Sequence, residues 1–306
     1  GDATNGDDKV RDDPIISEIR DVAEKDPEYQ ALIGEIIRDF ATVKNASEYI
    51  RKFLPVRHNL AVDEGLVLYG PRIVVPKAKQ EDVLQRLHAS HLGMTRMKQR
   101  ARAVIFWPGI TKDLEKMVEK CKLCQTYNAS QPKETMMSDP PPSYPFEEVA
   151  SDLFSIGKKQ YLVYTDRLSG YTEIAEWNHS PTAQEVAYVM RKFFINLGVP
   201  KILRSDQGPQ YAAASFARFL QRWGITWKPS SPHYPQSNGF AEVHVRTLKS
   251  MLKKMPRPDI TSEEFQEGLL ELRNTPRSDG RSPNEAVFGR NLRSRVPAHH
   301  SSFDPK

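Results

Sequence analysis

A proline-rich segment between residues 129 and 146 divides this chain into two halves. Its sequence, ASQPKETMMSDPPPSYPF, contains five prolines, so it cannot hold a helix and is predicted to be a semi-rigid linker. The chain has 306 residues, which is more than one domain usually contains. The sequence therefore predicts compact units on both sides of a linker at 131–146.

The half before the linker changes its hydrophobic period twice. Apolar residues at helical spacing predict three helices between residues 14 and 53, and apolar runs broken by Gly65 and Gly70 predict a small β meander up to residue 75. Three more short helices are predicted between residues 81 and 121. We expect an acidic tail at 1–13, a small α+β N-terminal extension domain at 14–76 and a three-helix module at 77–130.

The half after the linker begins with three closely spaced β segments between residues 149 and 177. Alternating helices and strands follow, which predicts a mixed five-stranded sheet with helices on its faces over residues 147–290. Residues 291–306 are predicted to be a C-terminal tail. The fold class is therefore a multidomain α/β protein.

Composition and charge narrow the classes of protein. The 39% of hydrophobic residues excludes a wholly disordered chain, and no run of 18 apolar residues predicts a membrane span. The acidic start GDATNGDDKV has no apolar run of a secretory signal, and without an initiator Met it suggests a processed polyprotein or a cloning remnant. The net charge of +5 permits nucleic-acid binding without demanding it.

The only two cysteines, Cys121 and Cys124, form a Cys-x-x-Cys pair in the same module as His88 and His91. Zinc prefers a tetrahedron of imidazole and thiolate ligands, and binding it would stabilise a module with a small core. A pair of surface histidines beside an unrelated reduced thiol pair is the plainer alternative. A redox pair is disfavoured because the motif does not follow a strand. The sequence favours a structural zinc site.

Three acidic residues stand out after the linker: Asp152 in VASDLFSI, Asp206 in ILRSDQGPQY and Glu242 in SPHYPQSNGFAE. Phosphoryl transfer on DNA uses two divalent cations, and Mg²⁺ requires oxygen ligands, so converging carboxylates are expected. Taken singly, each residue could instead shape a turn, cap a sheet edge or lie on a solvated helix face. Asp166 is the competing candidate for the first carboxylate.

These motifs carry a resemblance to a known family. LHASHLGMTRMKQRARAVIFWPGITKDLEKMVEKCKLCQ resembles the zinc-binding domain of gypsy-type LTR retrotransposon integrases, which belong to the retroviral integrase superfamily. DLF, SDQGPQY and SPHYPQSNGFAE match that family's catalytic Asp, Asp and Glu, including the 35-residue gap. The resemblance implies an RNase H-like catalytic core with zinc as the structural cofactor and Mg²⁺ or Mn²⁺ as the catalytic one.

The resemblance also implies an activity and its partners. The activity is 3′-end processing and strand transfer of element DNA into target DNA by a polynucleotidyl transferase. The implied partners are the two DNAs and a homo-oligomer, a dimer or tetramer without a membrane, located in a cytoplasmic virus-like particle and then in the nucleus. The family has a further β-rich domain or chromodomain after these residues, so that domain is expected either to have been cut off or to be missing.

Several residues are candidates for binding DNA. By motif position, His233 and Asn238 fall in the loop where the family contacts the DNA end. Arg246, Lys249 and Lys253 follow Glu242 at helical spacing and predict a cationic stripe. A second candidate set lies in the zinc module and consists of Arg96, Lys98, Arg100 and Arg102.

Two other functions compete with the integrase. One is a domesticated, integrase-derived protein that binds DNA or serves as a scaffold without catalysis, and the other is a free-standing RNase H-like nuclease. Intact Asp152, Asp206 and Glu242 favour the enzyme over the scaffold. The nuclease explains neither the zinc module nor the PQSNG sequence.

Overall fold

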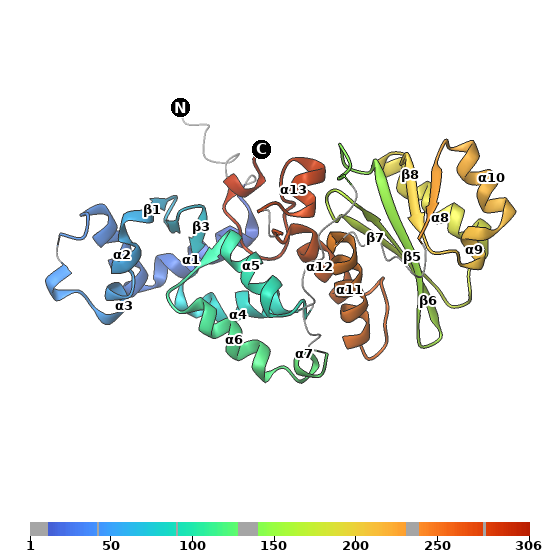
Figure 1. Cartoon of the computed structure of the whole chain (residues 1–306). Helices are drawn as coiled ribbons and strands as arrows, with labels where there is room; N and C mark the ends of the chain where they lie inside the picture. The colour runs from blue at the N-terminus through green and yellow to red at the C-terminus, as the bar shows by residue number, and fades with distance from the viewer. Residues whose placement is uncertain (1–11, 42, 90, 128–139, 231–238, 278–279) are drawn as a thin grey trace, which may run out of the picture.

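The computed structural model describes residues 12–41, 43–89, 91–127, 140–230, 239–277 and 280–306. Within these ranges, no helix combines the length and the apolar character that crossing a membrane requires. Figure 1 shows an elongated molecule with the helix-rich N-terminal half at one end and the five-stranded sheet at the other. The helices α11 and α12 and the C-terminal segment lie between them.

The N-terminal region forms the predicted helices and meander. Asp13 caps α1 and Asp26 caps α2, and each is followed by a proline whose fixed φ suits the first helical position. A turn at Glu64 and Gly65, both with positive φ, joins the first two strands. The elements are α1 Pro14–Lys25, α2 Pro27–Ile37, η1 Val43–Asn45, α3 Glu48–Arg51, η2 Leu54–Asn59, β1 Leu60–Asp63, β2 Leu66–Tyr69 and β3 Arg72–Val74.

The next module contains the three predicted helices and two short elements that the sequence pattern did not indicate. Its elements are α4 Lys77–His88, α5 Met94–Val104, β4 Ile105–Phe106, α6 Ile110–Lys120 and α7 Lys122–Thr126. Strand β4 pairs in parallel with β3, so this module completes the sheet β1-β2-β3-β4. One hydrophobic core runs from Ile19 to Cys124, so residues 14–126 pack as one body across the predicted boundary at 76.

The second half contains the predicted mixed sheet. Its strands are β5 Glu148–Ile156, β6 Lys159–Asp166, β7 Thr172–Trp177, β8 Ile202–Ser205 and β9 Thr226–Pro229. In the order β7-β6-β5-β8-β9, the first three strands pair antiparallel, while β8 and β9 run parallel to β5. This is the RNase H-like topology, so the predicted fold class is confirmed.

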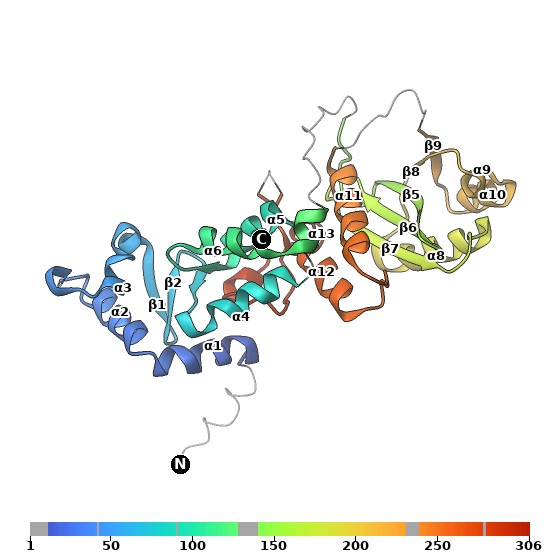
Figure 2. The ribbon, with the colours of Figure 1, turned by 90° about the horizontal axis from the view of Figure 1, so that it is seen from below.

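Helices cover both faces of this sheet. Alternate residues of β6 point to opposite faces: Leu162 and Tyr164 join one core, and Tyr161 and Val163 join the other. Figure 2 shows α11 and α10 on opposite sides of the sheet. The helices are α8 Ala183–Leu197, α9 Pro209–Ala212, α10 Ala214–Arg222, α11 Gly239–Lys254, α12 Glu263–Asn274, α13 Pro283–Phe288 and η3 His300–Phe303.

The C-terminal residues, predicted as a tail, run back to the N-terminal half. Val296 and Ala298 are buried in the N-terminal core. Arg293 donates to both carboxylate oxygens of Asp13, at 2.6 and 2.9 Å. This C-terminal segment therefore packs against the N-terminal half, where its apolar side chains are buried.

Candidate metal centres

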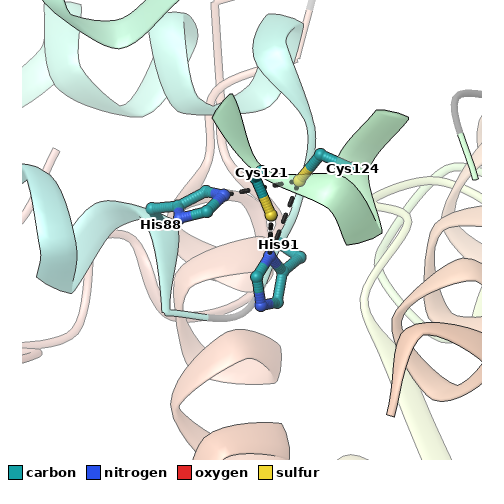
Figure 3. Close-up of side chains that lie close together, drawn as sticks. All are labelled: His88, His91, Cys121 and Cys124. Atoms are coloured by element: carbon teal, nitrogen blue, oxygen red, sulfur yellow. Dashed lines mark hydrogen bonds between the residues drawn. The ribbon is translucent and has the colours of Figure 1, made fainter. Parts of the chain in front are cut away.

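The structure brings together the four predicted zinc ligands. His88 ends α4, His91 lies in the following turn with positive φ, Cys121 caps α7 and Cys124 lies within α7. His91 Nδ1 lies 3.3 Å from the Sγ of Cys121 and 3.5 Å from that of Cys124, and His88 Nε2 lies 3.4 Å from Cys124 Sγ (Figure 3). All four ligand atoms lie within 4.8 Å of one another.

The chemistry of this cluster fits zinc. Burial lowers the pKa of His88 to about 4, so its imidazole is neutral and has a free lone pair at neutral pH. Burial raises the pKa of Cys124 to about 11, so its thiol keeps its proton unless a cation takes its place. Tetrahedral zinc with bonds of 2.0 to 2.3 Å places its ligand atoms about 3.5 Å apart. The separations in the cluster need little adjustment to reach that geometry.

The loop that carries His91 also touches the second half of the molecule. Lys254, at the end of α11, donates to the carbonyl oxygen of His91 at 2.6 Å. The next residue, Leu92, is buried against Leu248, Met251 and Leu252 of α11. The metal cluster is therefore fixed to the helix that contains Glu242.

The sheet places the first two predicted catalytic carboxylates at the same level. Strand β5 pairs in parallel with β8 in a register that places Ala150 opposite Arg204. Asp152 follows Ala150 by two residues, and Asp206 follows Arg204 by two residues, so the two carboxylates lie at the same level of the sheet. Tyr211 is buried nearby, and its hydroxyl group is 2.7 Å from Ser151 Oγ. Burial, followed by the charges of Asp152 and Asp206, raises the pKa of Tyr211, so both carboxylates act on one phenol.

Helix α11 lies against these strands. Its Lys249 donates to Asp152 Oδ2 at 2.9 Å, and its ammonium group also lies 4.5 Å from the centre of the Phe154 ring. Glu242 lies in α11 seven residues before Lys249, a spacing that puts both on one side of a helix. The side chain of Glu242 lies outside the described part of the chain, as do His233 and Asn238.

Asp166 has a structural role that separates it from Asp152. It is completely buried and accepts hydrogen bonds from the backbone N–H groups of Phe146 and Ser169 and from the Ser169 hydroxyl. A carboxylate whose oxygens are used in this way cannot bind a cation without breaking the turn after β6. Asp152 is 40% exposed and lies next to Lys249, so it is the carboxylate open to a ligand.

The basic residues differ in their environments. Arg246 and Lys253 are exposed on α11, while Lys249 is half-buried against Asp152. In the zinc module, the prediction for Arg100 was wrong: it is buried and bonds Glu271 of α12 at 2.7 Å, so it cannot face DNA. Lys98 pairs with Glu115, and Arg102 is exposed.

Sequence reasoning missed Tyr211, Lys254 and the partner of Arg100. Tyr211 lies inside the quoted motif SDQGPQY, so its place near Asp206 could have been noticed. Lys254 lies one position beyond the predicted stripe and faces the metal cluster instead of solvent. Glu271 is 171 residues from Arg100, a separation that no local pattern connects.

Comparison with known proteins gives matches in both halves. Residues 75–130 match the integrase zinc-binding domain, and residues 145–235 match the integrase core domain. The Caenorhabditis elegans protein K02A2.6 is 32% identical over 91% of this chain, and the Gag-Pol polyprotein of baboon endogenous virus is 29% identical over 71%. The Pro-Pol polyprotein of simian foamy virus type 3 is 26% identical over 78%.

The chain spans 22%, 13% and 22% of the lengths of these three relatives. Among solved structures, the catalytic core domain of BIV integrase is similar at 24% identity and a TM-score of 0.40, over 47% of this chain and 94% of that one. The zinc-binding and core domains occur here in one chain, in that order, together with viral Pol relatives. These two regions of the chain are therefore the zinc-binding and core domains of a retroviral-type integrase.

Proposed function

We propose that this chain acts on DNA as a metal-dependent polynucleotidyl transferase of a gypsy-type retrotransposon. The observation that carries the proposal is the pairing of β5 with β8, which sets Asp152 level with Asp206 beside the helix that contains Glu242. Carboxylates from two neighbouring strands and one helix form a donor set that hard divalent cations require.

The proposed activity consists of two reactions at one site. In 3′-end processing, water attacks a phosphodiester near the end of the element DNA, and a new P–O bond forms as the bond to the departing nucleotides breaks. In strand transfer, the resulting 3′-hydroxyl attacks a phosphodiester of the target DNA in the same way. Both reactions exchange one P–O bond for another, so the protein needs to position its substrates and stabilise charge.

The candidate residues have two proposed roles, metal binding and DNA binding. Asp152, Asp206 and Glu242 would hold Mg²⁺ or Mn²⁺, which when bound supplies Lewis-acid stabilisation of the attacking and leaving oxygens. Lys249 holds the Asp152 carboxylate at 2.9 Å and places a positive charge beside it. Arg246 and Lys253, exposed along α11, offer further charge to backbone phosphates, and His233 and Asn238 are proposed to contact the DNA end.

Zinc has a structural part in this proposal. His88, His91, Cys121 and Cys124 would hold it, and its binding would stabilise the fold of the N-terminal half. Because the His91 loop contacts α11, this stabilisation would extend to the helix with the third carboxylate.

Partners and location follow from the reaction. Joining two DNA ends to one target in a concerted step needs at least two active sites, whereas one chain supplies one Asp-Asp-Glu trio. We therefore expect a symmetric homo-oligomer, a dimer of dimers on DNA, with non-catalytic subunits bridging neighbours through residues 1–130 and the linker. The enzyme would act in the nucleus after leaving a cytoplasmic virus-like particle. Light scattering with paired DNA ends tests the assembly, and concerted joining by a single chain would contradict it.

A strand-transfer assay with labelled DNA ends tests the proposed activity. We expect joined products in Mg²⁺ or Mn²⁺ and none in EDTA. If the protein binds the DNA ends but gives no product with either metal, the alternative of a domesticated DNA-binding or scaffold protein is correct. Cleavage without joining would instead support the nuclease.

A further inference from the structure

A second cluster of metal-binding side chains lies away from both sites described above. It joins Asp63, at the end of β1, to His299 and His300 in the C-terminal segment, 236 residues further along the chain. His299 Nε2 lies 2.7 Å and His300 Nε2 3.9 Å from the same atom, Asp63 Oδ2. One ligand atom from each residue lies within 4.8 Å of the others.

The charges around Asp63 favour a cation at this place. In the described part of the chain, Asp63 pairs with two imidazoles, whereas the neighbouring Glu64 pairs with Arg20. No lysine or arginine in that part is paired with the Asp63 carboxylate, so an arriving cation need not displace one. Two imidazoles and a carboxylate suit Zn²⁺ better than Mg²⁺ or Ca²⁺, which prefer oxygen ligands alone.

We propose that Asp63, His299 and His300 form a second zinc site, which fastens the C-terminal segment to the N-terminal sheet. His300 is 74% exposed and Asp63 42%, so one side of the site is open to water. Three protein ligands and water make a weaker and more exchangeable site than the closed one at His88, His91, Cys121 and Cys124. The two sites therefore differ in strength and in ligand chemistry.

Ser301 supplies the partner that His299 needs for this role. His299 Nδ1 accepts from the backbone N–H of Ser301 at 3.3 Å and lies 2.8 Å from its hydroxyl oxygen. In the neutral ring, Nε2 then carries the proton and donates it to Asp63. For Nε2 to bind zinc, the ring must change tautomer: Nε2 loses its proton, and Nδ1 gains one that it donates in a hydrogen bond to the Ser301 hydroxyl oxygen, so the Ser301 backbone N–H loses Nδ1 as its acceptor. The ring keeps one proton throughout, so the step balances.

Zinc stoichiometry of the whole chain tests the proposal. We expect two equivalents per chain in excess zinc, and one equivalent in Asp63→Asn and in His300→Asn. With Co²⁺ as the probe, the tight site gives thiolate charge-transfer absorption, whereas the second equivalent adds only ligand-field bands because it has no sulfur ligand. Ser301→Ala should weaken the second site about 10-fold.

His58→Asn, which alters an exposed histidine of η2, is the matched control and should keep both equivalents. A wild-type chain that binds a single equivalent would overturn the proposal. So would a second equivalent that persists in both Asp63→Asn and His300→Asn. Circular dichroism of each variant without added zinc shows whether the fold is kept, and because both exchanges alter partly exposed side chains, we expect it to be.

Discussion

The cysteine–histidine cluster and the carboxylate site differ in the charge and the origin of their ligands. The first gathers its ligands within 37 residues, and burial favours the neutral forms of two of them, because it lowers the pKa of His88 and raises that of Cys124. Neutral groups can lie at 3.3 to 3.5 Å from one another without repulsion. The fold therefore brings these four side chains to separations close to those that zinc requires.

The carboxylates come from β5, from the residue after β8 and from α11, and Asp152 has the Lys249 ammonium group beside it. Like charges repel at short distance unless a cation lies between them. The comparison teaches that neutral soft ligands can approach one another without charge repulsion, whereas hard anionic ligands repel one another and need cations between them. Substitutions in the cysteine–histidine cluster should therefore change the stability of the fold, and substitutions in the carboxylate site should change the catalytic activity.

The largest effect on folding is expected from Cys121→Ser. Losing a structural zinc removes on the order of 10 kcal/mol of apparent binding free energy, so α4 to α7 should unfold. Because residues 14–126 share one core and one sheet, α1 to α3 should lose protection with them, while β5 to β9 keep theirs. Hydrogen exchange measures each region, with His58→Asn as the control. Unchanged protection of α1 to α3 would mean that the two modules fold independently.

A smaller loss of folding stability is expected from Arg100→Met, which tests the contact between α5 and α12. It leaves the Glu271 carboxylate buried without its partner, which costs about 3–5 kcal/mol. The double variant Arg100→Met/Glu271→Met should recover most of this free energy, because no charge stays buried. Denaturant unfolding measures all three proteins, and Arg102→Met, an exposed neighbour on α5, is the control. Equal unfolding midpoints for Arg100→Met and the control would show that the buried pair contributes nothing.

The smallest effect is expected from Lys249→Met. Its ion pair with Asp152 is about one-third exposed, so its loss should cost less than about 1 kcal/mol of stability. If Lys249 contacts a DNA phosphate, the slope of log affinity against log salt should fall by about one unit. Lys192→Met changes an exposed lysine of α8, on the opposite side of the sheet, and should leave the slope unchanged. An unchanged slope for Lys249→Met would mean that Lys249 does not contact a DNA phosphate and only forms the ion pair with Asp152.

Local patterns predicted the parts of this molecule that depend on nearby residues. The helices between residues 14 and 53, the three β segments between residues 149 and 177 and the spacing of the four Cys and His ligands are all of this kind. Strand β4 escaped prediction because two residues carry no period, yet it merges two predicted domains into one core. The pairs Arg100–Glu271 and Lys249–Asp152 join residues that are far apart in the sequence. Without knowledge of these partners, the sequence predicts that Arg100 and Lys249 bind DNA.

The most direct test of the account is strand transfer by Asp152→Asn, Asp206→Asn and Glu242→Gln. Each exchange keeps the shape of the side chain and removes a metal-binding charge, so we predict losses of several orders of magnitude with zinc content and folding unchanged. Glu119→Gln, at an exposed carboxylate of α6, should retain full activity. A folded Asp152→Asn protein that still joins DNA ends would contradict the account, and if Asp166→Asn were inactive at the same time, Asp166 would be the first carboxylate.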